Sequence, residues 1–149
     1  MVYYSQHHGN TKKLIDAIAA QNEVTLIDVT QNETFDLTGF DCIGFASGIY
    51  FSSFAKQILA FADANLPESK AVFFMNTCGI QSPIVNFDAI RKIARAKNCF
   101  EIGTYQCLGY DTFGPFKMIG GIAKGHPNEK EIKGAVTFYE RVKDTFANE

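Results

Sequence analysis

The residues best suited to chemistry lie in short polar stretches that directly follow apolar runs. The first stretch, Ser5–Thr11, reads SQHHGNT and leads into a segment with helical spacing. Hydroxyl, amide and imidazole donors at a helix N-terminus can bind a phosphate, because the first N–H groups of a helix lack partners and carry partial positive charge. Gly9 would let the backbone approach such an anion closely. The alternative interpretation is an ordinary strand-to-helix turn with Asn10 as its cap.

Two later stretches combine glycine with aromatic or polar side chains. Ser47–Ser53 places Gly48 shortly before Tyr50 and Phe51. An aromatic side chain can stack on a flat ring system while the glycine backbone bonds to the edge of that ring. Alternatively, the two aromatic side chains only cover the edge of a sheet. Asn76–Gln81 is polar and contains a glycine, and its alternative reading is a plain turn between a strand and a helix.

Several widespread motifs are absent from the chain. Neither G-x4-G-K-[ST] nor G-x-G-x-x-G occurs, so the sequence lacks a P-loop and a Rossmann dinucleotide motif. No cysteine is followed six positions later by arginine, which excludes the cysteine-phosphatase loop. Cys42, Cys78, Cys99 and Cys107 form no C-x2-C pair. We therefore expect four free thiols and no bound metal.

The composition indicates a compact domain rather than a disordered or fibrous chain. The chain has 149 residues, of which 46% are hydrophobic and 20% are charged. That length can bury a core without disulfides or a structural metal. The net charge of −2 and the lack of a basic stripe give no reason to expect nucleic acid. No apolar run reaches the roughly 18–20 residues of a membrane span, and no secretory signal precedes Ser5. We expect one cytoplasmic domain over residues 1–149, with no membrane partner.

Short β-branched or aromatic runs alternate along the chain with segments of helical spacing. The expected strands are Val2–Tyr4, Val24–Val29, Cys42–Ala46, Ala71–Met75 and Phe100–Leu108. The expected helices are Thr11–Gln21, Ser53–Ala64, a segment around Ile90–Ala94, and a last one that starts after Pro127 with Asn128 and Glu131 as a capping box. This alternation predicts an α/β domain with a mainly parallel sheet. In such sheets ligands bind at the carboxyl ends of the strands, where the polar stretches lie.

One long stretch, Gly109–Pro127, has neither helical nor strand periodicity and contains several glycines. Loops of this length inside a compact domain are usually functional or disordered. Phe113, Phe116 and Ile122 make this one too apolar for a disordered segment. We therefore expect it to pack on the rest of the domain.

Taken together, the three polar stretches resemble the flavodoxin family, and the resemblance covers the whole chain. The clearest match is Gly9-Asn10-Thr11, which is similar to the end of the family's S/T-x-T-G-N-T phosphate loop. The resemblance implies a three-layer α/β sandwich with a five-stranded parallel sheet in order 2-1-3-4-5. It also implies non-covalently bound FMN, so that the redox chemistry belongs to the cofactor and not to a catalytic side chain.

The resemblance assigns cofactor contacts to this chain by position. The phosphate would be held by Ser5, Gln6, His7, His8, Gly9, Asn10 and Thr11. One side of the isoalloxazine would be held by Ser47, Gly48, Ile49, Tyr50 and Phe51, and the other by Asn76, Thr77, Cys78 and Gly79. Tyr110, Asp111 and Phe113 would approach the ring from the long loop.

Three departures from the family pattern carry information. His7 and His8 stand where the family usually has small hydroxyl residues, although a histidine can still donate an N–H to a phosphate. Ile80 stands where the family has a stacking aromatic side chain. One flavin face would then be covered by the long loop, with Phe113 as the candidate, or be open to a substrate. The first strand is short, as expected if the chain starts downstream of the usual family start.

The resemblance implies electron transfer, with unidentified redox proteins as partners of a monomer or weak dimer. Asp111 is the only carboxylate near the expected ring site, so we expect a less negative second reduction potential than in an acidic flavodoxin. An NAD(P)H-dependent quinone or flavin reductase on the same fold is the alternative, and a flavin-free interaction module is another. A signalling receiver domain is excluded, because Ser5 and Ser47 stand where that family needs acidic residues.

Overall fold

A parallel sheet forms the centre of the computed structural model, which describes residues 1–148. The strands are β1 (Val2–Tyr4), β2 (Ile27–Asp28), β3 (Cys42–Tyr50), β4 (Ser53–Phe54), β5 (Ala71–Cys78) and β6 (Phe100–Leu108). The helices are α1 (Asn10–Ala19), α2 (Lys56–Asn65), α3 (Asp88–Ala96) and α4 (Glu129–Ala147), with the 3-10 helices η1 (Val85–Phe87) and η2 (Gly114–Ile119). Among these residues no helix is both long and apolar enough to cross a membrane.

The sheet has the order that the flavodoxin resemblance implies. Its strands run β2-β1-β3-β5-β6, all parallel, and β4 only adds a short antiparallel pair to the end of β3. Without β4, the order along the chain is 2-1-3-4-5, so the predicted fold class is confirmed. The hairpin of β3 and β4 was not expected, because Tyr50 to Ser53 showed no strand pattern.

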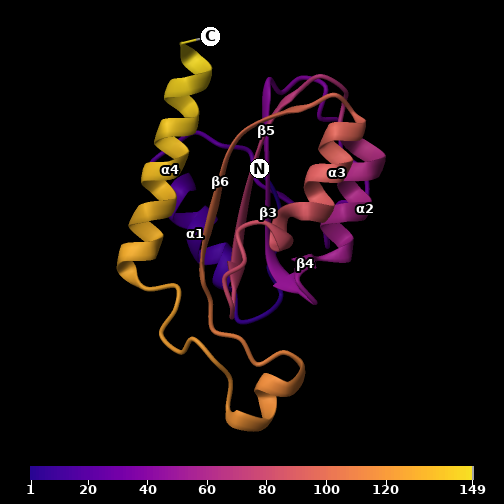
Figure 1. The fold of residues 1–149 in the computed structure, drawn as a ribbon. Helices are drawn as coiled ribbons and strands as arrows, with labels where there is room; N and C mark the ends of the chain where they lie inside the picture. The colour runs from indigo at the N-terminus through magenta and orange to yellow at the C-terminus, as the bar shows by residue number, and fades with distance from the viewer. Residues whose placement is uncertain (149) are drawn as a thin grey trace.

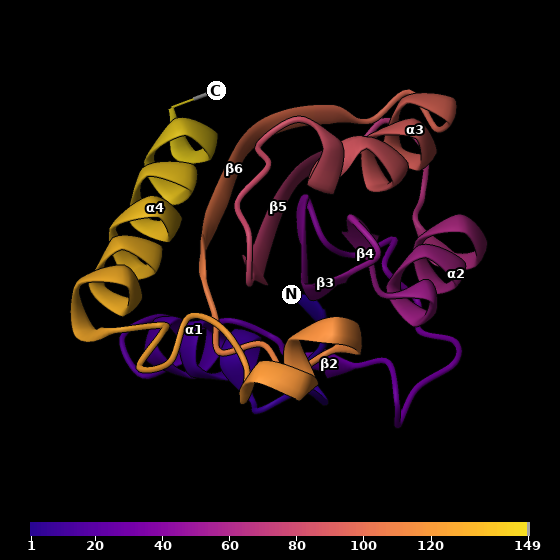
Figure 2. The same cartoon turned by 60° about the horizontal axis from the view of Figure 1, so that its bottom comes forward.

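Two pairs of helices cover the two faces of the sheet (Figures 1 and 2). Helices α1 and α4 lie on one face, and α2 and α3 lie on the other. Successive residues of β5 point to opposite faces. Accordingly, Phe73 packs in the core under α1 and α4, with Leu14 and Phe138, whereas Phe74 packs in the core under α2 and α3, with Ile58.

The strands that form the site extend further than their apolar runs suggested. β3 continues past Ala46 to Tyr50, and β5 continues past Met75 to Cys78. The added residues are polar or glycine, but parallel pairing of Ser47 with Asn76 keeps them in the sheet. At the edge, β2 is shorter than the predicted Val24–Val29, because the three-residue β1 pairs only with Ile27 and Asp28.

The helix boundaries follow local signals where those signals exist. Asn128 accepts the Glu131 N–H and the Glu131 side chain accepts the Asn128 N–H, so the predicted capping box of α4 is confirmed. Helix α2 starts at Lys56 rather than Ser53, because Ser53 and Phe54 pair with β3 instead. The long loop from Gly109 to Pro127 contains η2 and lies beyond the carboxyl ends of β5 and β6 (Figure 1).

Candidate functional site

The loops that follow β1, β3, β5 and β6 meet at the carboxyl edge of the sheet. Together they line a small cavity of about 20 Å³. Its walls are formed by Ser5, His7, Asn10, Thr11, Gly48, Ile49, Tyr50, Thr77, Cys78, Gly79, Gly109, Tyr110 and Asp111. The structure therefore brings the three polar stretches of the sequence, and part of the long loop, to one place.

The first loop presents unpaired backbone donors at the start of α1. Gly9 has a φ of 65° and Asn10 begins the helix. The N–H of Lys12 donates to the Ser5 hydroxyl at 2.9 Å, and the N–H of Lys13 donates to the carbonyl of Gly9 at 3.1 Å. No acceptor within residues 1–148 bonds to the N–H groups of residues 9 to 11. Unpaired N–H groups at a helix N-terminus can bind an anion.

Side-chain hydrogen bonds tie this loop to the neighbouring ones. The hydroxyls of Thr11 and Thr77 lie 2.9 Å apart, and the Asn10 amide donates to the carbonyl of Tyr110 at 2.7 Å. The Asn10 side chain is 6% exposed, and its Oδ1 has no partner among the described residues. Gly109 permits this close packing, since a Cβ there would lie 2.8 Å from Asn10 Nδ2.

A second, more apolar cavity of about 240 Å³ lies beside the first. It is lined by Ile49, Phe51, Ser52, Cys78, Gly79, Ile80, Asn86, Asp111, Phe113, Pro115 and Phe116. Phe113 packs edge-on against Tyr50 and Phe51, with ring centroids 5.5 and 5.0 Å apart. The long loop thus supplies an aromatic side chain to this cavity, whereas Ile80 is 66% exposed.

Several of the residues that were expected to contact the cofactor do not line either cavity. The Ser47 hydroxyl is buried, where it accepts the Ala55 N–H at 2.9 Å and donates to the Gly48 carbonyl. Asn76 is buried and accepts a hydrogen bond from Gln106. Both side chains therefore hydrogen-bond to neighbouring parts of the fold and do not face the cavities. Gln6 and His8 are exposed beside the first cavity, and Gly9 takes part through its backbone.

Sequence reasoning missed several residues that the structure places at the site. They are Gly109 in the first cavity and Ser52, Asn86, Pro115 and Phe116 in the second. Gly109 directly follows an expected strand, so its position was a usable signal. Asn86 lies in η1, and no spacing in the sequence indicates that this segment reaches the site.

Comparison with known proteins agrees with this geometry. Residues 1–97 match the model of the flavodoxin domain. An uncharacterized protein of Methanocaldococcus jannaschii is 34% identical over 143 residues, which cover 95% of each chain. The chain belongs to the flavodoxin family.

Solved structures share the fold of this flavodoxin at low sequence identity. A flavodoxin, WrbA-like protein from Agrobacterium tumefaciens has a TM-score of 0.67 and 16% identity, covering 97% of this chain and 94% of its own. A flavodoxin from the domain Archaea has a TM-score of 0.59 and 15% identity, covering 95% and 96%. Fusobacterium nucleatum flavodoxin bound to flavin mononucleotide has a TM-score of 0.59 and 13% identity, covering 94% and 95%.

The charges at the site of this flavodoxin are few and fixed by hydrogen bonds. Among residues 1–148, Asp111 is the only carboxylate that lines either cavity. Its Oδ1 accepts the Phe113 N–H at 2.7 Å and lies 3.5 Å from His7 Nε2. Burial lowers the pKa of His7, the neighbouring His8 lowers it further, and Asp111 opposes both effects. We therefore expect the neutral form of His7 to predominate at pH 7.

Cys78 lines both cavities, and its thiol is expected to be unreactive. Burial raises the pKa of this thiol to about 12, with smaller contributions from Asp111 and Glu131. At pH 8 only about one thiol in 10⁴ would be ionised. We expect iodoacetamide to modify the half-buried Cys99 well before Cys78 in the native protein, as followed by peptide mass spectrometry. Modification of Cys78 at the same rate would contradict this assignment.

Proposed function

We propose that this flavodoxin binds FMN non-covalently at the carboxyl edge of its sheet and acts in electron transfer. The observation that carries the proposal is the set of unpaired N–H groups at residues 9 to 11, at the start of α1 and beside the hydroxyls of Ser5 and Thr11. A phosphate monoester fits such a donor set, because the helix N-terminus favours negative charge. The Fusobacterium nucleatum flavodoxin of the same fold is described as bound to flavin mononucleotide.

The phosphate would be held by the first loop. In this assignment the ligating residues are Ser5, Gln6, His7, His8, Gly9, Asn10 and Thr11. The orphan Oδ1 of Asn10 also fits FMN, since a buried acceptor without a partner is costly and a sugar-alcohol chain supplies hydroxyl donors. A single phosphate site in the described residues favours FMN over a dinucleotide.

The isoalloxazine would lie among the second, third and fourth loops. Its assigned contacts are Ser47, Gly48, Ile49, Tyr50, Phe51, Asn76, Thr77, Cys78, Gly79, Tyr110, Asp111 and Phe113. Ser47 and Asn76 would act through backbone atoms, since their side chains support the loops. Tyr50 and Phe113 offer ring faces, and Gly48 and Gly79 offer backbone edges. When bound, FMN supplies the capacity to carry one or two electrons.

The charge and the exposed side chains around the proposed isoalloxazine site affect the reduction potential of bound FMN and the choice of redox partner. Asp111 is the only carboxylate of the described residues that lines either cavity, so negative charge would oppose the second reduction step less than in an acidic flavodoxin. Large apolar side chains, Phe51, Ile80, Ile84, Met118 and Ile119, are exposed on the neighbouring loops. A redox partner protein with an apolar docking face suits these side chains, and the exposed Lys117 lies beside Met118 on the same loop.

The second candidate function is an NAD(P)H-dependent quinone or flavin reductase. The apolar cavity of about 240 Å³ beside the candidate ring site favours it, because a flat substrate could enter there. Within residues 1–148 no motif for a nicotinamide nucleotide accompanies that cavity. Electron transfer is therefore the function that the site supports better.

Stepwise anaerobic reduction of the FMN-loaded protein, followed by visible absorption, separates the two functions. We expect two resolved one-electron steps and no reduction by NADPH alone. A single two-electron step, together with rapid reduction by NADPH alone, would contradict the carrier and support the reductase. Failure of the protein to take up any FMN would contradict both.

A further inference from the structure

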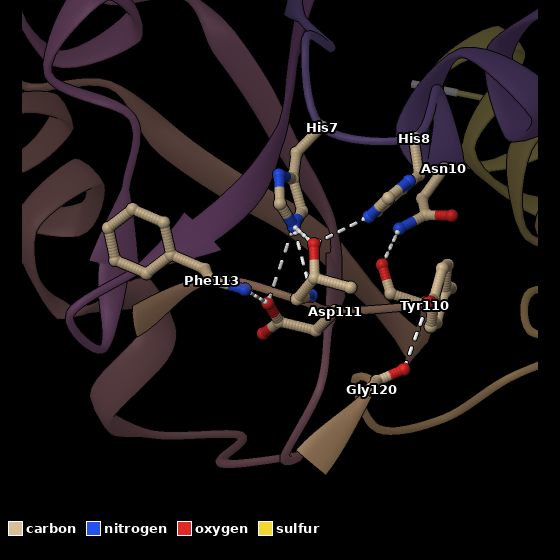
Figure 3. A network of polar contacts seen from close by, with 8 residues as sticks. His7, His8, Asn10, Tyr110, Asp111, Phe113 and Gly120 are labelled. Carbon is tan, nitrogen blue, oxygen red and sulfur yellow. Dashed lines mark hydrogen bonds and ion pairs between the residues drawn. The ribbon is translucent and has the colours of Figure 1, made fainter. Parts of the chain in front are cut away.

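The long loop is fastened across the phosphate-binding loop by a compact set of hydrogen bonds (Figure 3). We call residues 109–127 the strap. The strap residue Thr112 donates its N–H to His7 Nε2 at 3.1 Å, and its hydroxyl lies 2.8 Å from His8 Nε2. Asn10 adds the bond to the carbonyl of Tyr110 at 2.7 Å. The first loop and the strap are thus joined by residues about a hundred positions apart.

The bond from Thr112 requires His7 to be neutral. Because Nε2 accepts the Thr112 N–H, the single ring proton of His7 lies on Nδ1. A protonated imidazole carries a proton on both nitrogens and cannot accept this bond. Protonation of His7 would therefore break the bond that the Thr112 N–H donates. The new Nε2–H would face the Thr112 hydroxyl at 3.3 Å and Asp111 Oδ1 at 3.5 Å instead.

The groups around His7 keep it neutral in the absence of a ligand. His8 faces it from the same loop at a ring distance of 4.4 Å, and Tyr50 faces it from the end of β3 at 6.5 Å. From the strap, Asp111 approaches Nε2 at 3.5 Å. Burial and His8 together outweigh Asp111 and lower the pKa of His7.

An anion bound in the first cavity would instead raise the pKa of His7. His7 lines this cavity together with Asn10 and Thr11, whose N–H groups are unpaired. A phosphate dianion there adds two negative charges next to the imidazole and favours its protonated form.

We propose that His7 and Thr112 form a proton-dependent latch, in which binding of a phosphate monoester dianion is coupled to protonation of His7 and to loss of the hydrogen bond from the Thr112 N–H to His7. The proton comes from solvent, and the Thr112 N–H exchanges its imidazole acceptor for water. Thr112 is a positioning residue, which attaches the strap to His7 and His8. The identity of the phosphate monoester as FMN rests on the proposed function, whereas the latch itself does not.

The latch predicts that phosphate binding strengthens as the pH falls. A group whose pKa is higher in the complex than in the free protein takes up a proton on binding, so affinity rises as the pH falls below the pKa in the complex. We expect FMN affinity to rise by about tenfold between pH 8 and pH 6, since one coupled proton gives at most a factor of ten for each pH unit. In His7→Gln, whose side-chain oxygen can accept the Thr112 N–H at any pH, we expect less than about a twofold change.

Hydrogen exchange of the FMN-free protein tests the latch independently of FMN. After correction for intrinsic rates, we expect the Thr112 amide to be protected at pH 8 and to lose protection as the pH falls through the pKa of His7, because protonation removes its acceptor. His7→Gln should keep its protection over the same pH range. Equal pH dependence in the two proteins would overturn the latch, because exchange at Thr112 would not depend on His7.

Adding inorganic phosphate in place of FMN distinguishes a failure of the latch from a failure of the proposed FMN function. Loss of protection at the Thr112 amide on addition of phosphate, without any uptake of FMN, would support the latch and contradict the proposed FMN function. FMN uptake with the same pH dependence in wild type and His7→Gln would support the FMN function and overturn the latch. The His7→Gln comparison also removes the titration of the phosphate group itself, which is the same for both proteins.

Discussion

Asn10→Asp is expected to weaken FMN binding by about 100-fold, the equivalent of roughly 2–3 kcal/mol. The substitution keeps the shape of a side chain that is 6% exposed, so the fold has no steric reason to change. It replaces the amide donor to the Tyr110 carbonyl with an acceptor. It also places a negative charge at the start of α1, where the phosphate of FMN would bind.

Measuring riboflavin affinity of Asn10→Asp distinguishes a loss of phosphate binding from a general distortion of the site. Riboflavin lacks the phosphate, so its affinity should fall much less than that of FMN. Asn98→Asp is the matched control, because Asn98 is exposed at the opposite end of the sheet, just before β6. We expect that variant to bind FMN like the wild type in a fluorescence titration. An equal loss of FMN and riboflavin affinity in Asn10→Asp would contradict the assignment of the phosphate site.

Phe74→Ala is expected to reduce the free energy of unfolding by about 3–5 kcal/mol. The side chain is fully buried at the centre of β5, and its ring centroid lies 6.4 Å from those of Phe45 and Phe54. Truncation removes buried apolar surface and leaves a cavity between the sheet and helices α2 and α3. Urea unfolding followed by circular dichroism measures the loss.

Phe100→Ala provides the control for that substitution. Phe100 is 47% exposed at the start of β6, so its truncation creates no enclosed cavity. We expect it to cost less than about 1 kcal/mol. If the two alanine variants lost similar amounts of stability, the core between β5 and helices α2 and α3 would not be packed as the structure has it.

The sheet order and the loops of the site were predictable because they follow from short-range patterns. Apolar runs such as Ala71–Met75 identify strands that are covered on both faces, and the helical spacing of Leu14 and Ile18 identifies α1. Parallel strands place their following loops at the same edge of the sheet. The polar loops after β1, β3 and β5 therefore had to meet once the topology was set, and the structure shows them together.

Other features depend on contacts that leave no local pattern. The attachment of Thr112 to His7 joins residues 105 positions apart, and neither stretch indicates its partner. The inward-turned side chains of Ser47 and Asn76 likewise depend on the Ala55 N–H and on Gln106, which lie on other elements. A polar residue after a strand can face a ligand or support its loop, and only the three-dimensional arrangement distinguishes the two.

The most direct test of the central claim is a calorimetric titration of the purified FMN-free protein with FMN, with riboflavin and FAD titrated in parallel. The account predicts one FMN for each chain, and affinity for riboflavin at least about tenfold weaker because the donors at Gly9, Asn10 and Thr11 would have no phosphate to bind. FAD should also bind more weakly, since the cavity lies next to one phosphate site. Equal affinity for FMN and riboflavin, or no binding of any flavin, would contradict the proposed site.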